Sequence, residues 1–101
     1  MFTHWYANAD YLEENSATAD KFVAAIEKAN DYANEHPDEA NALLGKALSM
    51  PDEIAGLLPV TTYGGDVSEE DVQWYFDVVK KYGWNEKELP PAGEAIWSSG
   101  S

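Results

Sequence analysis

The 101-residue sequence contains no cysteine and no arginine, and its only fixed positive charges are six lysines. Without thiols, the chain cannot form disulfides, carry out thiolate catalysis or build a cysteine-based zinc or iron–sulfur site. Without arginine, it lacks the planar donor that grips carboxylate, phosphate or sulfonate with two hydrogen bonds. The chain alone is therefore not expected to hold an anionic ligand.

Positive charge is scarce overall, because 19 Asp and Glu residues give a formal charge of −13 and a pI near 4.2. Nucleic acids and anionic membranes attract clustered cations, so no nucleic acid or membrane partner is expected. No apolar run approaches the roughly 20 residues of a membrane-spanning helix. The N-terminus lacks the basic and apolar regions of a signal peptide, so we expect no signal peptide in this chain.

Hydrophobic residues make up 45% of the chain and aromatic residues 13%, which is typical of a folding polypeptide. The length corresponds to one small domain with a modest core. We expect a single helical domain over residues 1–97. Residues 98–101 are expected to be a flexible tail or the remnant of a tag.

Apolar residues at helical spacing predict an all-α fold with four to five helices. The clearest helix is expected over residues 18–35, with Ser16 or Thr18 as its N-cap. One or two helical turns are expected before it, over residues 9–14. The aromatic residues 2–7 predict at most one marginal strand.

Proline is tolerated in the first turn of a helix, so Pro37 and Pro51 are expected to open two further helices. Ser68 begins a capping-box pattern, and Gly83 stands where a left-handed residue closes a helix. These two residues are expected to bound the best-marked helix of the chain. Residues 84–101 are expected to be irregular.

No residue pattern in the chain points to catalysis. His4 and His36 belong to no metal-ligand motif, and His36 is expected to cap a helix at the surface. Acid pairs such as Glu69–Glu70 fall in the first turns of expected helices, where the helix dipole accounts for them. Calcium-loop, phosphate-loop and nucleophile motifs are absent. The sequence therefore predicts no enzyme, no catalytic residue, no metal and no cofactor.

Aromatic residues gather around the helix expected after Ser68. Tyr75 and Phe76 lie on its apolar stripe and are expected in the core. Trp74 lies about 100° from Tyr75 around the helix and broadens the apolar surface beyond one face. Excess apolar surface on an acidic chain indicates a partner.

Helix-boundary motifs occur as ADYLEEN at residues 9–15, KFVAAI at residues 21–26, DYANEHPDEA at residues 31–40 and KKYG at residues 80–83. Together they resemble the C-terminal part of solute-binding proteins of ABC importers. Within these solute-binding proteins, the chain resembles the family of nitrate, sulfonate, taurine and thiamine-precursor type. The similarity extends over about residues 5–97.

The resemblance implies the C-terminal helical part of a type II periplasmic-binding-protein-like fold, in which two hinged α/β lobes trap a small solute. It implies an extracytoplasmic parent, periplasmic or anchored as a lipoprotein, with a small-molecule solute and an ABC permease as partners. The chain would then be a fragment whose sheets lie elsewhere in the parent. Its first residues would lie nearest the solute cleft, so Thr3, His4 and Trp5 are the candidate ligand contacts.

Two further interpretations stay open. The first is a free-standing acidic helical module that binds another protein through its aromatic surface. The second is a small hydrolase, for which no catalytic geometry can be named. A fragment would also leave apolar side chains without a sheet to meet, so we expect a homodimer or higher oligomer. The side chains concerned are Trp74, Val78, Trp84 and Trp97, with faces of Phe22, Ile26, Leu43 and Leu44.

Overall fold

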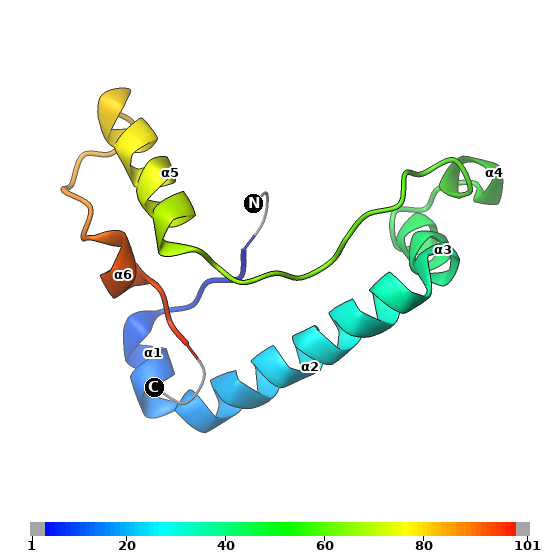
Figure 1. Ribbon diagram of the computed structural model, residues 1–101, viewed down its shortest axis with the longest axis horizontal. Helices are drawn as coiled ribbons and strands as arrows, with labels where there is room; N and C mark the ends of the chain where they lie inside the picture. Colours follow the sequence, from blue (N-terminus) through cyan, green and yellow to red (C-terminus); the bar gives the residue numbers. More distant parts are fainter. Residues whose placement is uncertain (1–3, 99–101) are drawn as a thin grey trace. The chain divides into compact units, whose positions relative to one another are not determined.

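The computed structural model describes residues 4–98, and within this range the protein has six helices and no strand (Figure 1). The helices are α1 (Ala9–Glu14), α2 (Ser16–Glu35), α3 (Pro37–Ala47), α4 (Asp52–Ala55), α5 (Glu69–Lys81) and α6 (Ala92–Ala95). The predicted all-α class is confirmed. Two compact units are present, one of residues 1–20 and 66–101, the other of residues 21–65. The single domain expected over residues 1–97 stays a prediction.

Helices α1 and α2 are separated by Asn15 alone. The Asn15 side-chain amide donates to the Tyr11 carbonyl at 3.0 Å and so closes α1. The Asn15 carbonyl accepts the N–H groups of Thr18 and Ala19 at 3.0 and 3.1 Å. Helix α2 therefore already begins at Ser16, and the prediction of Ser16 or Thr18 as its N-cap is wrong. One asparagine ends the first helix and starts the second.

Proline opens two helices, as the sequence predicts. Pro37 is the first residue of α3, and Pro51 directly precedes α4. Helix α4 stops at Ala55. The N–H groups of Leu57 and Leu58 donate to carbonyls only three residues earlier, at 3.0 and 3.2 Å, so the α-helical pattern does not continue. Such tighter turns commonly finish a short helix.

Helix α5 has the ends predicted for it. Ser68 Oγ accepts the N–H of Asp71 at 3.1 Å, which satisfies one of the unpaired donors of the first turn. Gly83 has a φ of 64°, and the N–H of Trp84 reaches the Val79 carbonyl at 3.1 Å. This six-to-one bond after a left-handed residue is the Schellman motif.

Helix α3 ends in the same motif, but with serine in the left-handed position. Ser49 has a φ of 54°, and the N–H of Met50 donates to the Gly45 carbonyl at 2.8 Å. The N–H of Ser49 donates to the Lys46 carbonyl at 3.2 Å. A residue with a Cβ pays about 1 kcal/mol for this conformation.

The prediction of at most one marginal strand is confirmed for the described residues, whereas the prediction that residues 84–101 are irregular is corrected. Residues 4–8 form no strand, and a strand needs a neighbour, which the part of the chain that the structure describes does not contain. Residues 2 and 3 lie outside the described residues. Helix α6 lies in a stretch expected to be irregular, and it brings the helices to six. Four residues are too few to show a helical period, and the packing of α6 on α5 shapes this turn.

Each unit holds one close helix pair. In residues 21–65, α3 packs on α4 through Gly45 and Ala55, and both residues are buried. In the other unit, α6 packs on α5 through Ala92, which is 1% exposed. The N–H of Ala92 donates to Gln73 Oε1 at 3.1 Å, and Gly93 faces the Glu69 carboxylate. Among residues 4–98 only small residues are fully enclosed, so the described part of each unit has no core of large side chains.

Candidate functional site

The protein exposes more surface than compact bodies of its mass. Its accessible area is 8637 Å² for a mass of 11.2 kDa. Two separate compact bodies sharing this mass would together expose about 6,900 Å². The accessible area is therefore roughly 1,700 Å² larger than that of two separate compact bodies. An excess of this size indicates surfaces that are made to be covered.

In the unit of residues 1–20 and 66–101, the large exposed apolar side chains are nearly all aromatic. They are Trp5, Tyr6, Tyr11, Val67, Trp74, Tyr75, Tyr82 and Trp84. Trp74 is 60% exposed, in line with the broad apolar surface predicted for α5. Tyr75 is 39% exposed, so the prediction that it lies in the core is wrong. The helix that packs on α5 has only four residues and is too short to cover Tyr75.

The structure brings His4, a predicted ligand contact, to the aromatic side chains of α5. Its ring meets Tyr75 edge-on, with ring centroids 6.3 Å apart, and Tyr75 meets Trp74 edge-on at 5.0 Å. Trp5 is 73% exposed, and Thr3 lies outside the described residues. The three rings of His4, Tyr75 and Trp74 form a continuous aromatic row. The ligand contacts at Thr3, His4 and Trp5 stay a prediction.

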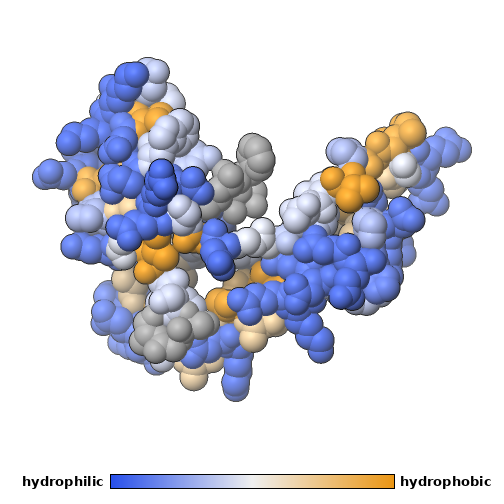
Figure 2. All heavy atoms as spheres, viewed as in Figure 1, coloured by the Kyte–Doolittle hydropathy of each residue, from blue (hydrophilic) through white to orange (hydrophobic). Residues whose placement is uncertain are grey.

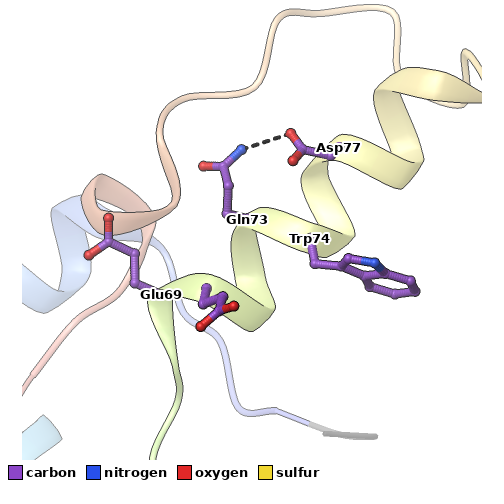
Figure 3. Close-up of a pocket in the computed structure, with 5 residues that line it drawn as sticks. Glu69, Gln73, Trp74 and Asp77 are labelled. Carbon is purple, nitrogen blue, oxygen red and sulfur yellow. Dashed lines mark hydrogen bonds between the residues drawn. The ribbon is translucent and has the colours of Figure 1, made fainter.

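A shallow depression runs along one face of α5 and is lined by Glu69, Glu70, Gln73, Trp74 and Asp77 (Figure 3). These residues recur at spacings of three and four, so a single helix supplies the whole lining. The amide of Gln73 is engaged at both ends, because Nε2 donates to Asp77 Oδ1 at 3.0 Å and Oε1 accepts from α6. The depression is therefore a helix surface with one tryptophan wall, and sequence analysis gave no sign of it.

In residues 21–65 the exposed apolar surface is instead aliphatic over α3, α4 and the residues that follow. It consists of Leu43, Leu44, Leu48, Ile54, Leu57 and Val60, which we call the aliphatic surface. Figure 2 shows orange, hydrophobic spheres over α3 and α4. Leu57 and Val60 are the most exposed members, at 79% and 74%. Branched aliphatic side chains of this kind are typical of surfaces that pack against another apolar face.

His36 stands at the N-cap position of α3, as predicted, and is exposed. Its carbonyl accepts the Ala40 N–H at 3.0 Å, while its ring lies against Tyr32 with centroids 4.4 Å apart. The Tyr32 hydroxyl donates to Glu39 Oε2 at 2.7 Å. This hydrogen bond, together with the negative charge of Glu39, raises the pKa of Tyr32 above 10.0. The cluster ties the end of α2 to the start of α3.

Across residues 4–98, no three His, Asp or Glu side chains come together in a group that could hold a metal ion. No helix in that range combines the length and apolar character needed to cross a bilayer. The candidate functional features are thus the aromatic row, the depression on α5 and the aliphatic surface.

Comparisons with known proteins add one finding. No curated protein and no solved structure matches the chain. Residues 3–40 match the family model described as NMT1/THI5 like, which covers fewer than half of the 101 residues. The matched stretch contains α1, α2 and the first turn of α3. It links this part of the chain to solute-binding proteins of the ABC-importer type.

Proposed function

We propose that the chain is a helical segment of the extracytoplasmic solute-binding component of an ABC-type importer. In the full-length parent it would take part in capturing a small molecule and delivering it to a permease, without catalysis. The observation that carries this proposal is the family match over residues 3–40. Two of the motifs behind the resemblance, at residues 9–15 and 31–40, lie in the matched stretch.

The exposed apolar surface supports the same proposal. A segment of a two-lobe protein would carry helices whose apolar faces cover the sheets of the lobes. The aliphatic surface over α3 and α4 is such a face, since nothing in residues 21–65 covers Leu43, Leu57 or Val60. Covering these side chains would supply the large core that neither unit has by itself.

The finer part of the proposal places solute contacts at Thr3, His4 and Trp5. Small-molecule sites commonly combine aromatic walls with a few polar groups. The aromatic row of His4, Tyr75 and Trp74 offers such a wall, with an imidazole at its end. Tyr75 and Trp74 of this row belong to α5, which is distant in sequence from His4.

The test begins with the coding sequence that adjoins this one. A continuous frame encoding two α/β lobes, or neighbouring permease and ATPase genes, would support the proposal. The parent is then expressed and its melting temperature measured with nitrate, sulfonates and pyrimidine precursors. A true ligand at 100 times its Kd should stabilise it by about 2.7 kcal/mol. A parent that none of these solutes stabilises would contradict the proposal.

Single variants of the parent test the contacts. His4→Ala and Trp5→Ala should each weaken binding of the stabilising solute, measured by calorimetry. Tyr6→Ala is the matched control, because Tyr6 is the next aromatic residue and is 98% exposed. Affinities that stay unchanged in both His4→Ala and Trp5→Ala would remove these residues from the site.

A second function, an acidic helical module that binds another protein, is favoured by the exposed tryptophans. Trp74 and Trp84 are 60% and 72% exposed, and tryptophan is enriched at the centres of protein interfaces. A short complete gene that starts at the codon for Met1 would favour this function over the first.

A further inference from the structure

The longest stretch without a charged residue runs from Ile54 to Gly65, twelve residues between Glu53 and Asp66. One quarter of the whole chain is charged, and the net charge is −13. Like charges repel across about a Debye length, roughly 10 Å at 0.1 M salt. Two copies of this chain can therefore approach each other most easily along this stretch.

Within that stretch, residues 60–63 run as an open, non-helical connection after α4 (Figure 1). Asn34 of α2 holds this segment from one side. The Asn34 amide donates to the Tyr63 carbonyl, and the Tyr63 N–H donates to Asn34 Oδ1, both at 2.8 Å. This paired exchange reproduces what a neighbouring strand would offer. Gly64 and Gly65, with φ values of 89° and 123°, end the segment.

The opposite edge of the segment is open. Backbone polar groups of consecutive residues in an extended chain point to opposite sides. Both groups of Tyr63 face Asn34, so in an extended segment those of Thr61 would lie on the same side and those of Val60 and Thr62 on the opposite side. In the part of the chain that the structure describes, the backbone groups of Val60, Thr61 and Thr62 make no hydrogen bond. Val, Thr and Tyr are also strong strand formers.

We propose that residues 60–63 pair antiparallel with the same segment of a second copy of this chain, around a two-fold axis. Val60 then lies opposite Thr62 of the second copy, and each such pair exchanges two backbone hydrogen bonds. The register is set by Gly64, whose positive φ prevents the strand from continuing. Thr61 meets Thr61 of the second copy at the axis.

The occupant is a second copy because an antiparallel pair of identical segments is self-complementary, and because residues 54–65 carry no charge that would repel the same stretch of another copy. Val60, which is 74% exposed, lies within the paired segment. Asn34 occupies the other edge, so pairing closes at two copies and does not extend into a ladder.

This inference concerns the 101-residue chain and does not depend on the proposed function. The test is the molar mass by light scattering over a concentration series at low salt and at about 1 M sodium chloride. We expect a shift from 11.2 kDa towards twice that mass with concentration, at lower concentration in high salt. A mass that stays at 11.2 kDa throughout would overturn the proposal.

Two proline variants test the edge itself. Thr62→Pro removes an N–H that faces the second copy, so the dimer dissociation constant should rise at least tenfold. Thr61→Pro is the matched control, because its lost N–H faces away from the second copy. Circular dichroism checks that both variants keep their helices. Equal effects of the two variants would overturn the pairing.

Amide hydrogen exchange of the unmodified chain gives a readout that needs no variant. The amides of Val60 and Thr62 should exchange more slowly as concentration rises, and the Thr61 amide should not. Protection of Thr61 together with Val60 and Thr62, or of none of them while the mass doubles, would place the dimer interface elsewhere and overturn the proposal.

Discussion

Gly45 is the position where one added methyl group should have the clearest effect. It lies in α3 against Ala55 of α4, and a Cβ on Gly45 would overlap the Cβ of Ala55. Carbon atoms in contact normally stand about 3.5–4.0 Å apart, so Gly45→Ala must push α4 away from α3. This helix pair is the close contact of residues 21–65.

Two opposing effects decide the magnitude. Replacing glycine by alanine inside a helix favours the helix by up to about 1 kcal/mol. Overpacking a tight contact costs about 1–3 kcal/mol. Here the two atoms that meet are both Cβ atoms, the new one on residue 45 and that of Ala55, and a Cβ cannot move away by a change of rotamer. We expect the packing cost to exceed the helix gain by about 1 kcal/mol, which corresponds to a roughly five-fold increase in local opening.

Amide hydrogen exchange of Ala55 and Gly56 measures this opening directly. Both amides are bonded within α4, at 3.0 Å to the carbonyls of Pro51 and Asp52. Gly45→Ala should speed their exchange about five-fold, since exchange follows the opening equilibrium. In the control Gly56→Ala, the new Cβ meets its nearest atom, the Asp52 carbonyl oxygen, at 3.5 Å, which is ordinary contact. If Gly45→Ala exchanged as slowly as this control, the tight packing of α3 on α4 would be refuted.

Four further outcomes are expected. Ser49→Gly should stabilise the end of α3 by about 1 kcal/mol, and Gly83→Ala should destabilise α5 by a similar amount, both followed by thermal unfolding. Equal melting temperatures of Ser49→Gly, Gly83→Ala and the unmodified chain would contradict the strain at Ser49. The melting temperature of the unmodified chain should rise between low salt and about 1 M sodium chloride, because salt screens repulsion within a chain of charge −13. A flat or falling curve would show that this repulsion does not limit stability. Glu39→Gln should lower the pKa of Tyr32 towards 10.0, because it removes the acceptor charge that disfavours tyrosinate. Tyrosinate absorbance in an alkaline titration measures this pKa, and an unchanged value would contradict the role of Glu39.

The helix ends could be predicted from the sequence because each depends on residues a few positions apart. Ser68 bonds to Asp71, three residues on, and Gly83 supplies a backbone angle that needs no distant partner. Pro37 opens α3 for the same local reason. The start of α2 was missed, since the Asn15 carbonyl accepts its first bonds and no hydroxyl cap is needed. The all-α class follows from local signals of this kind.

Burial and pairing, in contrast, depend on residues that are distant in sequence. The apolar stripe of α5 did not reveal that Tyr75 stays 39% exposed, because its exposure depends on the length of the helix that packs there. Helix α6 forms where Ala92 meets Gln73, 19 residues earlier. Asn34 and Tyr63 are 29 residues apart, and no periodicity links them. The sequence alone therefore determined the start of α3 and both ends of α5, which depend on neighbouring residues. The tertiary structure decided which surfaces stay open, because that depends on which distant segments meet.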